Sequence, residues 1–289
     1  MKFSDFMRIF KIEITLLVDM VAVAGFLVNP SFQSHIILLI PLLVSGTAAS
    51  MSAALFNNIY DRDIDPEMHR TAYRSKLVNN SNVRFYTVAG ILMLIFAVSL
   101  SSIMINLLTS IFIFLGFVSY VFLYTIFLKR RTSWNIVIGG IAGSFPALAG
   151  WAAVSNSVSL TSIFIAGIVF LWTPTHFWNL AVTQADDYKN AGIPMLPAVS
   201  GVSGSYKWIL LNTVILVFYS LLPLFISQIR VGFLYDIIAI LLGALFILVE
   251  VEPYRRSLSS QSFIRGFHFS NSYLLILLIS ICLVNYISI

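Results

Sequence analysis

Apolar residues form long blocks along this chain, separated by short polar segments. Residues 85–128 contain no charged side chain, and residues 132–185 contain no Asp, Glu, Lys or Arg. The blocks lack the strict alternation of a β-barrel strand, and a helix of about 20 apolar residues can cross a bilayer. The pattern predicts nine membrane-spanning helices, near residues 12–29, 36–56, 84–103, 107–128, 135–154, 159–181, 208–227, 231–249 and 268–287.

The composition supports a lipid environment. Of the 289 residues, 59% are hydrophobic and 10% are charged, whereas a soluble domain has about 45–50% apolar and 25% charged residues. These proportions exclude a soluble enzyme, a disordered chain and a nucleic-acid-binding module, so no nucleic-acid partner is expected. We predict an all-α polytopic membrane protein with a single domain over residues 1–289 and the lipid bilayer as its surroundings.

The basic residues predict an orientation. If the N-terminus is cytoplasmic and the chain crosses nine times, every Lys and Arg of the 17 except Arg230 falls on the inner side. This is the distribution of the positive-inside rule, and it places the C-terminus outside a prokaryotic cell membrane. The long polar connections 57–83 and 182–207 also lie on the inner side. Chemistry is therefore expected at the cytoplasmic face.

The densest polar segment is FNNIYDRDIDPEMHRTAYR, residues 56–74. Asn57, Asp61 and Asp65 are spaced by four residues. If the second helix continues through them, they lie about 5–6 Å apart on one face. Mg²⁺ prefers one or two carboxylates together with substrate phosphates. The segment therefore predicts a Mg²⁺–diphosphate site; the simpler alternative is a solvated loop of mixed charge.

Three basic side chains within this segment are candidates for binding phosphate oxygens: Arg62, Arg70 and Arg74. A second polar segment, THFWNLAVTQADDYKNAGIPMLP (175–197), follows the sixth predicted span. It contains Asp186, Asp187 and Lys189, and His176 lies within or near the membrane. An ionisable group in a membrane helix is a functional candidate, although a lone histidine often has only a packing role.

Three segments together resemble the UbiA superfamily of intramembrane prenyltransferases, and specifically its heme-modifying branch. They are NNIYDRDIDPEMHRT (57–71), LKRRTSWNIVIGGIAGSFPALAGWAAV (128–154) and THFWNLAVTQADDYKNAGIPMLP (175–197). The first is typical of the whole superfamily, and the other two are typical of the heme branch. The resemblance covers most of the chain and implies a UbiA-type helical bundle.

The resemblance implies a reaction in which farnesyl diphosphate, heme B and water give heme O and diphosphate. Asn57, Asp61 and Asp65 would form the first Mg²⁺–diphosphate motif, and Asp187 would be the acid of the pattern DYKNAGIP (187–194). The second pair of carboxylates found in many relatives is absent. Heme B would be a substrate and not a cofactor, and a downstream heme-modifying or oxidase-assembly protein is a candidate partner.

Further substrate contacts follow from this expectation. Lys129, Arg130 and Arg131 are placed to meet heme propionates or diphosphate, or serve only as topology anchors. His176 would ligate heme iron or bond within the bundle. Aromatic faces steady an allylic cation; the candidates include Tyr124 and Trp178. Two rival functions stay open: prenyl transfer to a quinone precursor or lipid alcohol, and cation transport through intramembrane acids.

Overall fold

The computed structural model describes residues 3–283, and within them every regular element is a helix. The elements in chain order are α1 (Phe3–Ile9), α2 (Ile12–Leu27), η1 (Phe32–Leu38), α3 (Leu39–Tyr60), η2 (Asp61–Asp63), η3 (Asp65–Glu67), α4 (Arg74–Leu77), α5 (Val83–Met104), α6 (Leu107–Val118), η4 (Ser119–Leu128), α7 (Asn135–Gly139), η5 (Gly140–Gly143), α8 (Phe145–Ser155), α9 (Leu160–Val182), α10 (Ala185–Asn190), α11 (Leu196–Ser220), η6 (Leu222–Leu224), α12 (Phe233–Arg255) and α13 (Ser260–Cys282).

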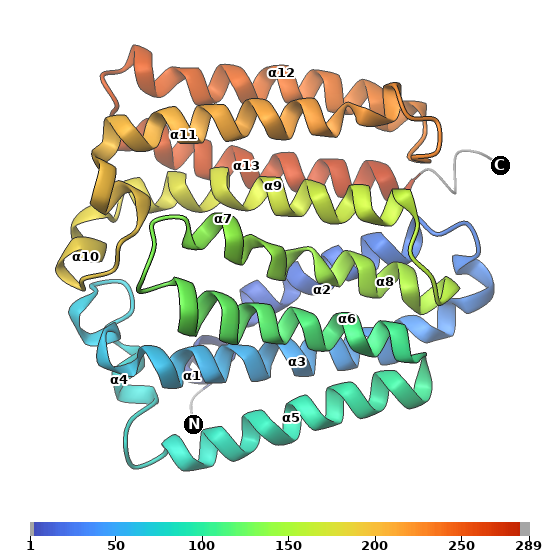
Figure 1. Ribbon diagram of the computed structural model, residues 1–289, viewed down its shortest axis with the longest axis horizontal. Coiled ribbons are helices and arrows are strands. Elements are labelled where there is room, and N and C mark those ends of the chain that lie inside the picture. The colour runs from blue at the N-terminus through green and yellow to red at the C-terminus, as the bar shows by residue number, and fades with distance from the viewer. Residues whose placement is uncertain (1–2, 284–289) are drawn as a thin grey trace.

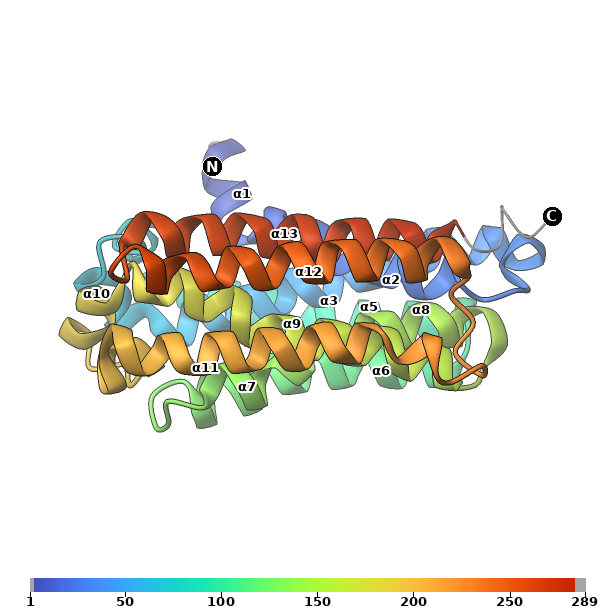
Figure 2. The same ribbon diagram turned by 90° about the horizontal axis from the view of Figure 1, so that it is seen from above.

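The long helices run side by side, and the short helices α4 and α10 gather at one end of the bundle, at the left of Figure 1. Helix α1 projects from the bundle in the second view (Figure 2). Neighbouring helices pack as the pairs α3–α5, α2–α8, α9–α11 and α12–α13. The outer surface is apolar: Ile103 is 80% exposed and Phe85 is 70% exposed. Such a surface suits contact with lipid rather than water.

Eight helical segments within residues 3–283 are long and apolar enough to cross a membrane. The prediction of an integral membrane protein is therefore supported. The first predicted span corresponds to α2, whose 16 residues are fewer than the other spans have. The predicted count of nine is not confirmed, and the predicted end of the last span, 284–287, lies outside the described residues.

Two predicted spans differ in their interior. The span 135–154 is not one helix, because Gly139, Gly140 and Gly143 lie where α7 passes through a 3-10 turn into α8. Glycine lowers helix stability and lets other chains approach. The predicted helix 208–227 begins earlier, at Leu196, and has a non-helical residue at Gly201, whose φ is 68°. Neither difference alters the order of the crossings.

Close contact between α2 and α8 depends on two glycines. A Cβ atom added to Gly25 would lie 2.1 Å from the carbonyl oxygen of Ala147, and one added to Gly150 would lie 2.0 Å from that of Ala22. In lipid, helices associate through such close backbone approach, because burial against another apolar surface gives no hydrophobic gain. The two glycines therefore allow the short distance between α2 and α8.

We expect Gly150→Ala to lower the free energy of unfolding by about 1–3 kcal/mol, because the added methyl group forces α2 and α8 apart. Gly116→Ala in α6 is the matched control, since a Cβ there would meet Phe145 at an ordinary 3.5 Å. Thermal unfolding of both purified variants in detergent makes the comparison. Equal melting temperatures for the two variants would contradict the proposed close contact.

Candidate active site

The acidic segment lies where α3 ends. Helix α3 stops at Tyr60, and two 3-10 turns, η2 and η3, carry the chain through Asp61 and Asp65. The α-helix does not continue through Asp65, so the four-residue spacing does not act through one regular helix. The amide and both carboxylates are nevertheless buried together: Asn57 is 3% exposed, Asp61 0% and Asp65 2%.

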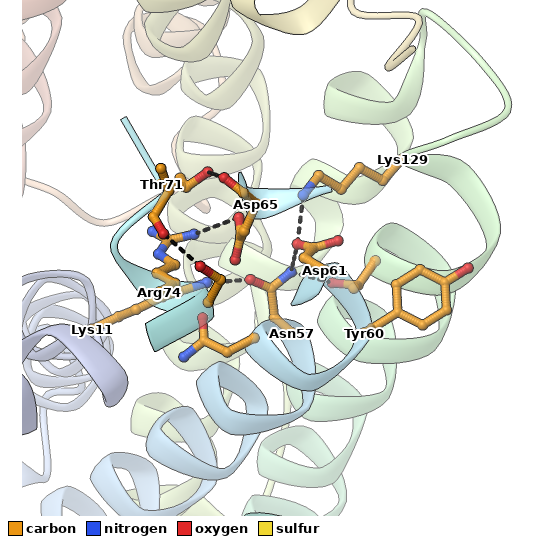
Figure 3. Close-up of polar contacts among 12 residues, drawn as sticks. Lys11, Asn57, Tyr60, Asp61, Asp65, Thr71, Arg74 and Lys129 are labelled. Carbon is orange, nitrogen blue, oxygen red and sulfur yellow. Dashed lines mark hydrogen bonds and ion pairs between the residues drawn. The ribbon is translucent and has the colours of Figure 1, made fainter. Parts of the chain in front are cut away.

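Asp61 is the centre of a polar network (Figure 3). Its Oδ2 atom accepts from Lys129 Nζ at 2.5 Å and from Asn57 Nδ2 at 2.9 Å. Arg130 Nη2 lies 3.8 Å from Oδ1. A carboxyl group buried away from water needs hydrogen-bond donors and a counter-charge, and these contacts supply both to Asp61.

A π-helix brings Lys129 to Asp61. Helix α6 passes into the ten-residue segment η4, and its end is marked by a bond from the Lys129 amide to the Tyr124 carbonyl at 2.8 Å, five residues earlier. A π-helix widens the turn and often occurs at functional sites. Along η4, the rings of Tyr120 and Tyr124 pack in a tilted arrangement with their centroids 5.7 Å apart. The same segment therefore positions a cation and two aromatic rings.

Asp65 has a looser ion pair. Arg74, the first residue of α4, lies 3.7 Å from Asp65 Oδ1, and Thr71 donates to the main-chain oxygen of Asp65 at 3.3 Å. Burial raises the pKa of the Asp65 carboxyl, while the Arg74 guanidinium acts in the opposite direction. Asp65 is thus a carboxylate whose charged form needs a nearby cation.

Lys11 joins the site from the start of the chain, although no sequence motif marks it as a site residue. It lies between α1 and α2 with a φ of 49°, which ends one helix and redirects the next. Its Nζ atom donates to Asn57 Oδ1 and lies 3.4 Å from the Tyr120 hydroxyl. Burial, followed by the repulsion of Arg74, holds the pKa of Lys11 well below its usual value. No local pattern signals this contact, because 46 residues separate Lys11 from Asn57.

The other predicted basic residues divide into two groups. Arg130 forms two bonds of 2.7 Å with Asp63 and lies over the Tyr60 ring. The hydrogen bond with Asp63 raises the pKa of Arg130. The remaining three do not form an ion pair with Asp61 or Asp65: Arg62 donates to the Ile59 carbonyl, Arg70 is exposed, and Arg131 lies over the Phe127 ring.

The oxygen atoms present fit a hard cation. Asp61 Oδ1 and Asp65 Oδ2 are buried and accept no hydrogen bond, and the Asn57 amide oxygen lies in the same network. Within the described part of the chain, no group of three His, Cys, Asp or Glu residues is arranged to hold a metal. Mg²⁺ needs only one or two carboxylates when waters and phosphates complete its shell. Asp61 and Asp65 therefore fit Mg²⁺, whereas the predicted third ligand, Asp187, stays a prediction.

The second polar segment forms α10, which lies at the same end of the bundle as α4 (Figure 1). Asp187 is half-buried and Lys189 is exposed, while Tyr188 between them is buried. No direct contact of Asp187 or Lys189 with the Asp61 network is seen among the described residues. Their roles in binding Mg²⁺ and diphosphate stay predictions.

His176 is buried in α9 and faces α13. Its Nδ1 atom lies 2.8 Å from Ser270 Oγ, and its ring is stacked between Trp172 and Phe267, with centroid distances of 4.2 and 4.4 Å. Trp178 is 1% exposed and has no partner for its indole nitrogen. The structure thus gives His176 the packing role weighed from the sequence, and leaves contact with a substrate as a prediction.

Residues 18–272 match the UbiA prenyltransferase family. The chain belongs to this family. A protein named protoheme IX farnesyltransferase 2 from Picrophilus torridus is 55% identical over 97% of both chains. A protoheme IX farnesyltransferase from Saccharolobus islandicus is 36% identical, with 99% of this chain and 98% of the relative aligned.

Solved structures support the UbiA fold. A digeranylgeranylglyceryl phosphate synthase matches with a TM-score of 0.79, 17% identity and 98% of both chains covered. A UbiA homologue from Archaeoglobus fulgidus, bound to DMAPP and Mg²⁺, matches with a TM-score of 0.68 and 16% identity. That alignment covers 95% of this chain and 99% of the homologue. At these identities the likeness establishes the fold alone, and the sequence relatives establish the family.

We expect Asp61→Asn to lower the free energy of unfolding of this UbiA protein by about 3–5 kcal/mol, because Lys129 would keep a buried charge without its partner. Asp63→Asn is the control. The Asp63 side chain is 61% exposed, and an exposed ion pair contributes about 0–1 kcal/mol. Thermal unfolding in detergent without ligands measures both, and a larger loss for Asp63→Asn would refute the network described here.

Proposed function

We propose that this chain transfers the farnesyl group of farnesyl diphosphate to a vinyl group of heme B, with addition of water, giving heme O and diphosphate. The observation that carries the proposal is the buried pair Asp61 and Asp65 at the end of α3, each beside a cation. The names of the relatives, at 55% and 36% identity over nearly the whole chain, support heme as the acceptor.

The chain's own residues would prepare the diphosphate to leave. Lys129 and Arg74 lie beside the carboxylates and supply positive charge where the leaving group gains negative charge. Such preorganised charge is most effective where water is excluded. Asp61 and Asp65, with Asn57, would hold Mg²⁺, which when bound supplies further neutralisation of the diphosphate.

The transfer itself breaks the bond between the farnesyl C1 atom and the diphosphate oxygen. The vinyl group then forms a carbon–carbon bond to C1, the oxygen of water bonds to the resulting cationic carbon, and one proton is released. Tyr120 and Tyr124 belong to η4, the segment that leads to Lys129 at Asp61. Their ring faces can stabilise an allylic cation. Arg130 and Arg131 would meet the heme propionates at the polar end of the bundle.

The active site would lie at the cytoplasmic end of the bundle. The end of α3, α4 and α10 occupy one end of the bundle, and Asp61 directly follows α3. The distribution of basic residues supports placing that end in the cytoplasm of a prokaryotic cell. Heme would enter with its propionates at this face and its macrocycle in the bilayer. The product would then be available to a heme-modifying or oxidase-assembly protein.

Incubation of the purified protein with farnesyl diphosphate, Mg²⁺ and heme B should yield a heme heavier by the mass of a farnesyl group plus a hydroxyl group. We expect Asp61→Ala and Asp65→Ala to reduce formation of this heme by more than about 100-fold. The two aspartates would hold the Mg²⁺ that neutralises the leaving diphosphate, and this neutralisation would be lost. EDTA should stop the reaction and Mg²⁺ should restore it.

Glu67→Ala is the control for this assay, because the Glu67 side chain is exposed in η3 beyond both aspartates. We expect it to retain activity within about fivefold. Mass spectrometry of extracted heme measures all variants. Prenylation of an aromatic acid in place of heme would instead assign the chain to the quinone-forming rival, and full activity in Asp61→Ala would refute the site.

A role of His176 in heme binding makes a separate prediction. We expect His176→Ala to weaken heme binding by about tenfold or more and to shift the absorption band of bound heme, because a neutral imidazole is a common iron ligand. His268→Ala is the control, since His268 is exposed on α13. An unchanged spectrum in His176→Ala would leave this residue with the packing role between Trp172 and Phe267.

A further inference from the structure

The two buried carboxylates are already matched by two cations. Lys129 Nζ lies 2.5 Å from Asp61 Oδ2, and Arg74 Nη1 lies 3.7 Å from Asp65 Oδ1. The two basic side chains are only 12% and 14% exposed, so solvent does little to screen them. A divalent cation that enters alone therefore meets two carboxylates whose charge is already neutralised.

The same cations are the groups that a diphosphate needs. Each reaches the site from a separate segment, Lys129 after η4 and Arg74 from α4 (Figure 3). A lysine ammonium is a compact charge on a flexible stem, and an arginine can bind two phosphate oxygens at once. A short rotation of either side chain can exchange a carboxylate partner for a phosphate partner without movement of the helices.

We propose that Lys129 and Arg74 take the place of the metal in the unliganded protein, and that they move to the diphosphate when the metal and the diphosphate enter together. This inference rests on the proposed function. While they bind Asp61 and Asp65, they keep a bare divalent cation from binding tightly. When a diphosphate arrives, the two side chains bind its oxygens and release the carboxylates to the metal. Lys129 and Arg74 thus couple metal binding to diphosphate binding.

The arrangement of the carboxylate oxygens agrees with this exchange. Asp61 Oδ2 accepts from both Lys129 and Asn57, while Asp61 Oδ1 and Asp65 Oδ2 accept no hydrogen bond. A metal has oxygen atoms to bind that accept no hydrogen bond, but Lys129 and Arg74 oppose its charge, and Arg130 Nη2 adds to this at 3.8 Å from Asp61 Oδ1. The obstacle to metal binding is therefore electrostatic, and substitution of one cation should remove part of it.

The experiment measures Mn²⁺, as a spectroscopic substitute for Mg²⁺, binding to the full chain in detergent with and without inorganic diphosphate. In the unsubstituted protein we expect Mn²⁺ to bind at least about tenfold more tightly when diphosphate is present, a usual size for coupling between sites. Lys129→Met should bind Mn²⁺ alone about tenfold more tightly than the unsubstituted protein. The same variant should bind diphosphate, at saturating Mn²⁺, about tenfold more weakly.

The opposite signs of these two changes are the test. Lys207→Met is the matched control, because it removes the same charge from an exposed position of α11, and both affinities should stay within about twofold. If Lys129→Met does not fold, Arg74→Met tests the same exchange at Asp65. Mn²⁺ binding that is unchanged or weaker in a folded variant would overturn the proposal.

Measurements of Mn²⁺ affinity and of heme O formation distinguish the proposed exchange from the proposed farnesyl transfer. If the unsubstituted protein forms heme O but Lys129→Met has an unchanged affinity for Mn²⁺, the farnesyl transfer is supported and only the proposed exchange of partners is rejected. Opposite shifts in the two affinities without any heme product would support the exchange and reject heme as the acceptor. Absence of Mn²⁺ binding to the unsubstituted protein, even with diphosphate, would overturn both.

Discussion

Burial of two carboxylates at the end of a membrane bundle is the constraint that organises this structure. A charged carboxylate removed from water is strongly unfavourable unless cations and hydrogen-bond donors surround it. The chain meets the requirement with irregular backbone at three separate places. The break at Lys11 brings an ammonium to Asn57, the π-helix η4 brings Lys129 to Asp61, and the turn before α4 brings Arg74 to Asp65. Each of these three departures from a regular helix therefore has a role in the site.

Elsewhere in the bundle, hydrogen bonds between polar side chains and close packing at small residues hold the helices together. Asn179 donates to Glu250 at 2.7 Å between α9 and α12, and Gly266 of α13 lies against both side chains. Trp172 donates to the Ser270 carbonyl at 2.7 Å, which joins α9 to α13 near His176. Bonds of this kind are expected in lipid, where packing and polar contacts determine which helices associate. They hold α9 in place, and α9 leads into α10 at the polar end.

The sequence predicted the helices and the acidic end of α3, because both depend on local patterns. Long apolar blocks require helices in lipid, and four acids in seven residues mark a site wherever the chain places them. Three features escaped prediction for physical reasons. The contact of Lys11 with Asn57 is non-local. The π-helix depends on packing against α7, where Tyr124 lies against Gly139. Glu250 lay just beyond a predicted boundary, yet α12 continues past it to Arg255.

The separate origin of the three cations also bears on biosynthesis. Lys11, Arg74 and Lys129 belong to segments that leave the ribosome in succession, and Lys129 comes last. Until η4 has entered the membrane, Asp61 lacks its closest cation and is better stabilised by water than by the bundle. We therefore expect the end of α3 to remain hydrated until Lys129 has been translated, because an unpaired buried carboxylate is unfavourable. The ion pair between Lys129 and Asp61 can form only after residue 129 has been translated.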